Sequence, residues 1–230
     1  RVLGGSTDIR AEPFPMLIKI CGLTRALDAE LAESLGANFL GAIMAGGPRN
    51  LDVVRAREVL GPRRHTVRRV AVFATQARTE IADIAHQLAL DVVQLHGDHS
   101  VEDIYWLKAN SGAEVWPVIR IAGTVLPEVT EVAAQAAGAV LLDAKVVGQL
   151  GGTGVALDWA ELRRDVRRLR ERVPGVQLIL AGGLRSTNVR QAREMLTPEI
   201  VDVSSGVESA PGIKDAAGLR AFFKAVRATP

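Results

Sequence analysis

The chain has 230 residues, of which 48% are hydrophobic and 23% charged, a composition typical of a globular protein with its own core. The formal net charge is only +2, and Lys and Arg are interleaved with Asp and Glu, so the sequence shows no nucleic-acid-binding footprint. A single cysteine excludes an internal disulfide and a zinc site built from several cysteines, and it suits a reducing compartment. No apolar run approaches the roughly 18 residues of a membrane span, and the start lacks the apolar core of a signal peptide. We therefore expect a cytoplasmic protein that binds neither nucleic acid nor membrane.

Short apolar runs alternate with segments of helical spacing along most of the chain. Residues 1–15 contain glycine, proline and mixed charges and are expected to form an N-terminal arm, which leaves 16–230 as one folded domain. The predicted strands cover residues 16–21, 38–44, 67–74, 91–96, 115–121, 139–143, 176–181 and 200–203. The predicted helices cover residues 25–35, 51–60, 79–90, 101–109, 126–137, 157–172, 186–196 and 215–228.

This alternation of strands and helices predicts a parallel sheet, and its repetition within this length favours closure into a single (β/α)8 TIM barrel. The competing architecture is an open doubly wound sheet, which would place a glycine-rich phosphate loop after the first strand. The residues found there, Cys21 to Thr24, do not form such a loop. Thr24 is instead expected to cap the helix that follows it, as Ser100 is expected to cap the fourth helix.

The seventh and eighth predicted strands both end in small residues. Gly182 and Gly183 follow the seventh strand, and Ser204, Ser205 and Gly206 follow the eighth. Glycine lets the backbone approach a ligand closely, and backbone N–H groups from two neighbouring loops form an anion site. Barrels of this type bind phosphate after these two strands. One such loop alone is more often a simple turn, but two in succession predict a phosphate site at Gly182, Gly183, Ser205 and Gly206.

Cys21 is predicted to end the first strand, on the face where barrel enzymes keep their active sites. Alternation along the strand puts Lys19 on the same inward face one step below, where its charge would favour the thiolate. A thiolate here would serve as base or nucleophile, and the alternative is a buried, inert cysteine. Asp143, at the end of the sixth strand, is a second candidate, although an aspartate there also suits a turn. Asp202, within the eighth strand, is expected to point inward and pair with Lys19.

Two further polar residues stand near the ends of predicted strands. Arg49, in the loop after the second strand, is a candidate to bind a substrate carboxylate, although an arginine in a loop usually faces solvent. His96 ends the fourth strand and is interpreted as a polar residue that lines the site. We expect no metal ion.

Several blocks of sequence follow one another from about residue 16 to the end. They are Lys19-Ile-Cys-Gly-Leu-Thr24, Val93-Gln-Leu-His-Gly-Asp98, Leu141-Leu-Asp143 with Gly151-Gly-Thr-Gly154 and Asp158-Trp159, Leu180-Ala-Gly-Gly-Leu184 with Asn188-Val189, Val201-Asp-Val-Ser-Ser-Gly-Val-Glu-Ser209, and Gly212-Ile-Lys-Asp215. In this order and spacing they resemble the phosphoribosylanthranilate isomerase family. One block alone would be a weak signal, whereas the whole series is highly specific.

The resemblance implies a (β/α)8 barrel of tryptophan biosynthesis that performs an Amadori rearrangement without a cofactor. The substrate would be N-(5-phosphoribosyl)anthranilate and the product 1-(2-carboxyphenylamino)-1-deoxyribulose 5-phosphate. By motif position, Cys21 would be the general base and Asp143 the general acid. The acid would protonate the furanose ring oxygen to open the ring to a Schiff base, and the base would remove the C2′ proton to give an enolamine. Phosphate would bind at the two small-residue loops, and the anthranilate carboxylate at Arg49, where this chain departs from the usual family pattern.

Two alternatives stay open. A phosphosugar isomerase of histidine biosynthesis, or one that acts on both substrates, resembles the same fold but has an aspartate where Cys21 stands. Its bisphosphate substrate needs a second phosphate site near the third and fourth strands, whose ends, residues 73–75 and 96–98, lack paired glycines. The other alternative is a barrel that binds a phosphosugar without catalysis, against which the presence of both Cys21 and Asp143 argues. Monomer and homodimer are equally compatible with the sequence.

Overall fold

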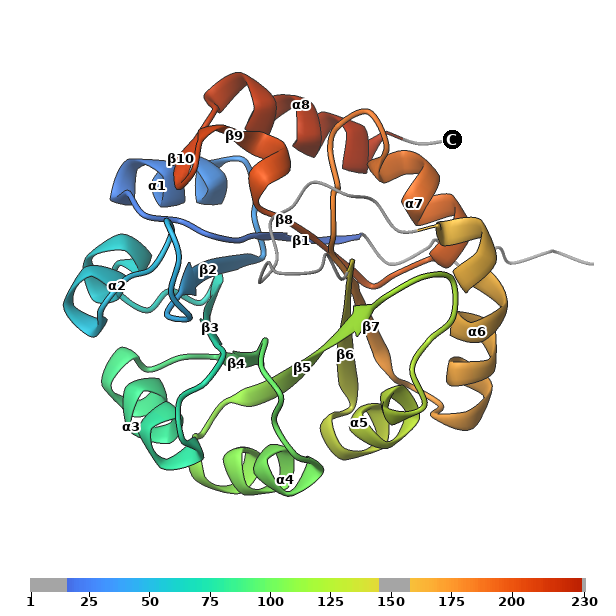
Figure 1. The fold of residues 1–230 in the computed structure, drawn as a ribbon. Helices are drawn as coiled ribbons and strands as arrows, with labels where there is room; N and C mark the ends of the chain where they lie inside the picture. The colour runs from blue at the N-terminus through green and yellow to red at the C-terminus, as the bar shows by residue number, and fades with distance from the viewer. Residues whose placement is uncertain (1–15, 145–157, 229–230) are drawn as a thin grey trace, which may run out of the picture.

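The computed structural model describes residues 16–144 and 158–228, in which eight parallel strands close into one barrel (Figure 1). The strands are β1 Leu17–Ile20, β2 Phe39–Ile43, β3 Arg68–Phe73, β4 Val92–Leu95, β5 Glu114–Ile121, β6 Ala139–Ala144, β7 Gln177–Leu180 and β8 Ile200–Val203. Each strand pairs with its neighbours in sequence, and β1 pairs with β8 to close the ring. The predicted (β/α)8 barrel is therefore confirmed. The predicted N-terminal arm, residues 1–15, lies outside the described residues.

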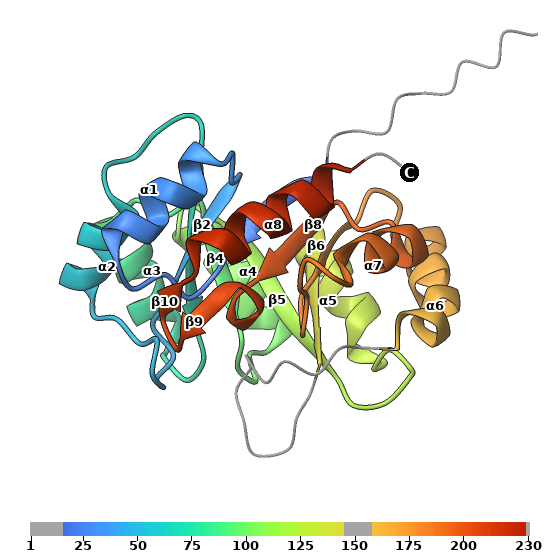
Figure 2. The same cartoon turned by 90° about the horizontal axis from the view of Figure 1, so that it is seen from above.

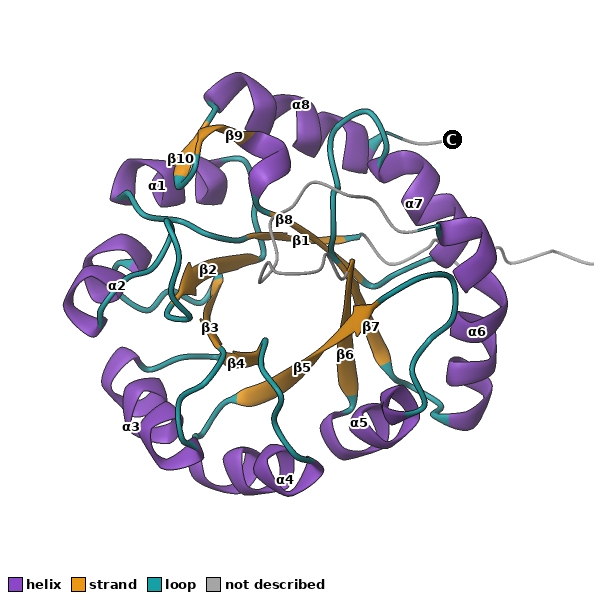
Figure 3. Ribbon diagram, in the orientation of Figure 1, coloured by secondary structure: helices purple, strands orange, loops and turns teal. Residues whose placement is uncertain are grey.

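The helices form a ring around the outside of the barrel (Figure 3). They are α1 Ala26–Ser34, α2 Val53–Leu60, α3 Arg78–Leu88, α4 Val101–Asn110, α5 Val129–Ala137, α6 Trp159–Arg172, α7 Val189–Leu196 and α8 Ala216–Arg227. Each helix turns its apolar side to the strands; α8, for example, buries Leu219, Phe222, Phe223 and Val226.

The apolar core has two layers. Ile18 and Ile20 of β1 belong to the outer layer, which lies between the strands and the helices. The inner layer fills the barrel and includes Phe39 and Trp116, whose rings meet edge to face with centroids 5.0 Å apart. Four of its members, Phe39, Val92, Ala139 and Ile200, are the first residues of their strands, so the inner layer fills the amino-terminal end of the barrel. The interior opens at the carboxyl ends of the strands.

The predicted cap at Ser100 is confirmed, since its hydroxyl accepts a hydrogen bond from the Asp103 backbone N–H at 3.1 Å. The predicted cap at Thr24 is wrong. Helix α1 has no side-chain cap, and the Thr24 hydroxyl donates instead to the carbonyl oxygen of Gly212. A contact between residues so far apart in the chain leaves no local signal in the sequence.

A short hairpin after β8 was not predicted. A single 3-10 turn, η1 Ser205–Val207, leads into β9 Glu208–Ala210, which pairs antiparallel with β10 Ile213–Lys214. The hairpin lies on the side of the barrel toward which β8 runs (Figure 2). In the view of Figure 1 it lies between α1 and α8. Its strands are too short, and its residues too mixed in polarity, to give the alternating pattern of a strand. It adds a structural element next to the end of the barrel where the interior opens.

Candidate active site

A cavity of about 580 Å³ opens at the carboxyl ends of the strands. This volume is typical of pockets that enclose a small molecule. All predicted site residues except Lys19 line it: Cys21, Arg49, His96, Asp143, Gly182, Gly183, Asp202, Ser205 and Gly206. Lys19 is fully buried next to this cavity, in contact with Asp202. The residues that the sequence predicts to form one site therefore lie around one cavity in the fold.

Cys21 follows the last residue of β1, and its backbone N–H donates to the Val203 carbonyl oxygen at 2.9 Å. One inward step below, Lys19 Nζ donates to Asp202 Oδ2 at 2.9 Å, and Lys19 has no exposed surface. Lys19 and Asp202 are register partners across the pairing of β1 with β8, so both side chains point into the barrel. The predicted ion pair between Lys19 and Asp202 is confirmed.

The thiol of Cys21 is subject to opposing effects. Burial raises its pKa, the positive charge of Lys19 lowers it, and the negative charge of Asp202 raises it again. The net result is a pKa above the ordinary value of 9.0, so Lys19 favours the thiolate as expected but does not outweigh burial. Burial also lowers the pKa of Lys19, but Asp202 and Cys21 together raise it above the ordinary 10.5. Lys19 is therefore a permanent positive charge beside the thiol.

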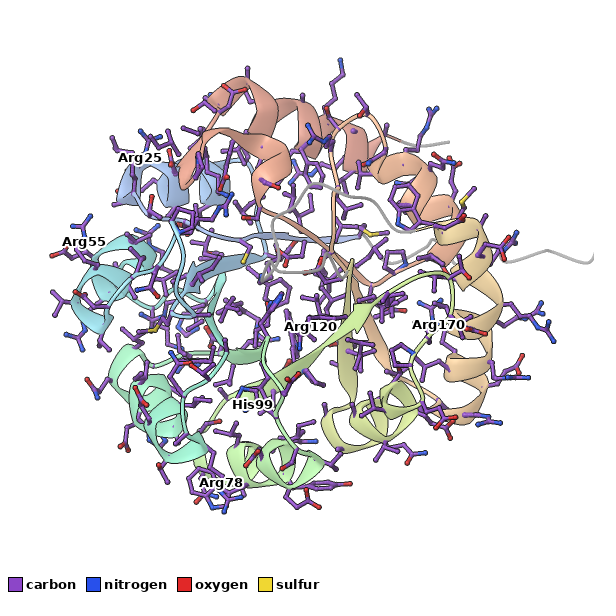
Figure 4. All side chains as sticks on the ribbon, in the orientation of Figure 1. Arg25, Arg55, Arg78, His99, Arg120 and Arg170 are labelled. Atoms are coloured by element: carbon purple, nitrogen blue, oxygen red, sulfur yellow. The ribbon has the colours of Figure 1, made fainter. Side chains whose placement is uncertain are left out.

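Asp143 lies near the end of β6 and is buried, with an exposed fraction of 7%. His96 approaches it from the end of β4, with Nε2 3.8 Å from Asp143 Oδ2, which is too long for a hydrogen bond. Burial lowers the pKa of His96 to about 4, and the positive charges of Arg120 and Lys19 add to the effect. Arg120 comes from β5 and is labelled near the centre of the barrel in Figure 4. The imidazole is therefore neutral at neutral pH, and it lines the cavity beside Asp143.

The loops after β7 and β8 touch through their backbones. A Cβ at Gly206 would lie only 1.9 Å from the carbonyl oxygen of Leu184, so this approach requires glycine. Gly182 and Gly183 have φ angles of +83° and +65°, in the left-handed region that favours glycine. The Asn188 side-chain amide donates to the Gly183 carbonyl at 3.0 Å and fixes the first loop. Together the loops bring backbone groups to one wall of the cavity, as an anion site requires.

Gly206→Ala is expected to weaken binding of a phosphorylated ligand such as ribose 5-phosphate about 100-fold, because the loops must separate by an ångström or more to admit the methyl group. Titration calorimetry measures this affinity. Gly175→Ala is the control: Gly175 also has a positive φ, but a Cβ there meets nothing within 4 Å. The control should lose some stability and keep the affinity. A Gly206→Ala protein with wild-type affinity would show that these loops do not bind phosphate.

Three charged side chains meet beside the cavity, and we call Arg49, Glu208 and Lys214 the rim cluster. Arg49 donates to Glu208 twice, from Nε to Oε1 at 2.9 Å and from Nη2 to Oε2 at 2.6 Å. Lys214 Nζ donates to Glu208 Oε1 at 2.8 Å and to the Ser204 carbonyl oxygen at 3.2 Å. Burial raises the pKa of Glu208, but the opposite effect of Arg49 and Lys214 is larger, so the pKa lies below its ordinary 4.5. Burial lowers the pKa of Lys214 below its ordinary 10.5, although Glu208 opposes that change.

Sequence reasoning gave no role to Glu208, Lys214 or Gly41. Glu208 and Lys214 are register partners in the β9–β10 hairpin, and the proline–glycine turn between them is the one local signal that predicts it. Gly41 is on β2, the strand next to β1. A Cβ at Gly41 would lie 3.2 Å from Cys21 Sγ and 3.3 Å from Lys19 Cε. Glycine at this position leaves just enough room for both side chains.

Within residues 16–144 and 158–228, no three His, Cys, Asp or Glu side chains gather closely enough to hold a metal ion. Of the helices in the same ranges, none combines the length and the apolar character that crossing a membrane takes.

Comparison with known proteins gives a consistent result. The family described as N-(5'phosphoribosyl)anthranilate (PRA) isomerase matches residues 18–225. N-(5'-phosphoribosyl)anthranilate isomerase of Pseudomonas aeruginosa (strain LESB58) is 41% identical over 216 residues, which cover 91% of this chain and 94% of that protein. Phosphoribosyl anthranilate isomerase from Thermus thermophilus superposes with a TM-score of 0.76 at 34% identity, covering 92% of this chain and 98% of the other.

A second solved structure is a phosphoribosyl anthranilate isomerase in complex with reduced 1-(o-carboxyphenylamino)-1-deoxyribulose 5-phosphate. It superposes with a TM-score of 0.74 at 28% identity and covers 92% of this chain and 98% of its own. The family match and the curated relative each extend over most of the barrel, which includes the cavity and both small-residue loops. The chain thus belongs to the N-(5'-phosphoribosyl)anthranilate isomerase family.

Proposed function

We propose that the protein converts N-(5-phosphoribosyl)anthranilate to 1-(2-carboxyphenylamino)-1-deoxyribulose 5-phosphate in tryptophan biosynthesis, with Cys21 as general base and Asp143 as general acid. One observation carries the assignment of roles. In the closed ring the strand order is β6–β7–β8–β1, so the two small-residue loops lie between the strand of Asp143 and the strand of Cys21. A sugar whose phosphate binds at these loops has one candidate on each side of its ring.

Asp143 acts first in this proposal. Its carboxyl group protonates the ring oxygen of the ribose, the C1′–O bond breaks, and the amine nitrogen forms a protonated Schiff base at C1′. Burial of Asp143 beside the neutral His96 suits this step, because a charged imidazolium at that position would favour the carboxylate over the protonated acid.

Cys21 acts second. Its thiolate removes the proton from C2′, and the electron pair forms the C1′–C2′ double bond of an enolamine, which then becomes the ketone of the product. Asp202 holds Lys19 in place, and the positive charge of Lys19 stabilises the Cys21 thiolate before it removes the proton. The step needs no metal or organic cofactor, because the Schiff base itself withdraws the electrons. A cytoplasmic location agrees with this biosynthetic role and with a single reduced cysteine.

The histidine-pathway substrate fits less well. It has a second phosphate, which would have to bind after β3 and β4. Those strand ends, residues 73–75 and 96–98, contain one glycine, Gly97, and lack the paired small residues found after β7 and β8. Cys21 at the end of β1 supports the anthranilate substrate as well.

A pH profile of the wild-type enzyme tests the proposal. Substrate loss, followed by fluorescence, should give a bell-shaped dependence of kcat/KM on pH, since the free enzyme must hold one proton on its acid and lose one from its base. The alkaline limb is expected above pH 9, because burial raises the pKa of Cys21 above 9.0. A profile with no inflection above pH 9 would assign the base to another group. A protein that binds ribose 5-phosphate and turns over no substrate would be the non-catalytic barrel.

A further inference from the structure

The rim cluster contacts the cavity, yet the acid–base steps described above do not use it. Arg49 lines the cavity, with 15% of its side chain exposed, whereas the side chains of Glu208 and Lys214 are 4% and 0% exposed. Burying an ionised carboxylate and an ammonium group away from solvent costs free energy that their mutual attraction does not always return. This makes the cluster a candidate for a role beyond stability.

The geometry leaves one edge of Arg49 available. Glu208 occupies Nε and one hydrogen of Nη2, and among the described residues it is the only acceptor that the guanidinium reaches. The remaining N–H groups, on Nη1 and on the other side of Nη2, form a second fork. A fork of this kind binds a carboxylate through two parallel hydrogen bonds.

The charges explain why Lys214 matters. With Arg49 and Glu208 alone, the pair would be neutral and would attract a substrate carboxylate only weakly. Lys214 supplies a second positive charge to the same carboxylate, at 2.8 Å from Oε1, so the cluster as a whole carries one positive charge. That charge is equal and opposite to the charge of one incoming carboxylate.

The location of Arg49 connects this charge to the reacting atoms. Its side chain passes over Gly22, where a Cβ would lie 2.7 Å from Arg49 Cδ. Gly22 directly follows Cys21, so a carboxylate on Arg49 would hold the attached ring, and the amine next to it, near the base. In the anthranilate substrate the carboxylate is ortho to the amine that is bonded to C1′.

The rim cluster is also held firmly. The Lys214 backbone N–H donates to Asp28 Oδ2 at 3.0 Å, and Arg25 holds Asp28 through two hydrogen bonds of 2.9 and 2.6 Å. Arg25 is labelled beside α1 in Figure 4. The hairpin that carries Glu208 and Lys214 is therefore anchored to the first turn of α1, and through Thr24 and Gly212 to the loop that follows Cys21. The cluster thus keeps its place relative to the base.

We propose that Lys214 is a positioning residue that acts through Glu208: it counters the charge of that carboxylate, so that Arg49 stays oriented and retains a positive charge for the aromatic carboxylate of the substrate. The inference rests on the proposed function, because it takes its ligand from the anthranilate substrate. It concerns recognition of one group, and leaves the roles of Cys21 and Asp143 unchanged.

Two probes test it: reduced 1-(2-carboxyphenylamino)-1-deoxyribulose 5-phosphate, and the same compound without the ring carboxylate. The quantity measured is the ratio of their dissociation constants by titration calorimetry. Lys214→Met is expected to reduce the wild-type preference for the carboxylated compound by about tenfold or more, while the affinity for the other compound changes by no more than about threefold. Lys214→Met combined with Glu208→Gln is expected to regain most of the preference, because Arg49 is again uncompensated.

The double variant separates charge from support. If Lys214 only held the hairpin in place, Lys214→Met would weaken both probes equally and the second change would add to the damage; either result overturns the inference. Lys214→Gln, which keeps a polar end near Ser204, replaces Lys214→Met if that variant does not fold, with the same expected loss. Lys224→Met, an exposed position on α8, is the control and should match the wild type. A wild type that binds neither probe would refute the proposed function itself.

Discussion

Cys21→Ser and Asp143→Asn are each expected to lower kcat by about 10²- to 10⁴-fold, the usual contribution of a positioned general acid or base. A serine hydroxyl has nearly the size of the thiol but does not ionise near neutral pH, so it cannot accept the C2′ proton. Asparagine keeps the shape of Asp143 and has no acidic proton for the ring oxygen. Fluorescence loss of N-(5-phosphoribosyl)anthranilate measures both rates.

Both variants should retain their affinity for reduced 1-(2-carboxyphenylamino)-1-deoxyribulose 5-phosphate to within about threefold, because neither change alters the loops after β7 and β8 or Arg49. Asp83→Asn, an exposed carboxylate on α3, is the matched control and should leave kcat unchanged. Wild-type turnover in the Cys21→Ser protein would mean that the base is another group. A variant that loses ligand binding as well would point to structural damage, and circular dichroism would reveal it.

Lys19→Met is expected to lower the free energy of unfolding by about 3–5 kcal/mol, since it leaves the carboxylate of Asp202 buried without its cation. Urea denaturation at neutral pH measures this value. Adding Asp202→Leu should restore most of the stability, because a buried ion pair is often replaceable by apolar side chains of similar volume. Lys224→Met, which removes an exposed lysine, is the control and should change stability by less than about 0.5 kcal/mol.

Activity should not return with stability in the Lys19→Met and Asp202→Leu double variant. Of the charges that act on the Cys21 thiol, that of Lys19 has the largest effect, and its loss raises the pKa of Cys21 further. The alkaline limb of kcat/KM would then move to higher pH than in the wild type. A double variant with wild-type activity and an unshifted limb would show that Lys19 serves the barrel and has no effect on the base.

The sequence allowed prediction of the barrel and of most of its cavity because both follow from short-range rules. Strand alternation was enough to place Lys19 and Cys21 on one inward face, and Asp202 on the strand that closes the ring. The predicted phosphate-binding role of the small residues after the seventh and eighth strands needed only these residues and the fold class. Each of these inferences needs only the order of elements and the direction of successive side chains.

What could not be predicted depends on contacts between distant residues. The Thr24 hydroxyl meets Gly212 across 188 positions, so its assignment as a helix cap was wrong. The charge of Lys19 was visible in the sequence, but the burial that outweighs it at Cys21 depends on Gly41 and the rest of the barrel wall. The partner of Arg49 was missed because Glu208 lies in a hairpin whose strands are too short for periodicity to reveal.

The pairing of β1 with β8 makes catalysis depend on completion of the chain. Lys19 and Asp202 are 183 residues apart, and the second small-residue loop follows only after Asp202. A nascent chain that has formed its first seven strands therefore has Cys21 and Lys19 without Asp202, and only the first of the two small-residue loops. Closing such a long loop is late and slow compared with local helix formation. Activity thus becomes a reporter of ring closure: during refolding it would return with the docking of the last strand on the first, after most of the helical signal has recovered.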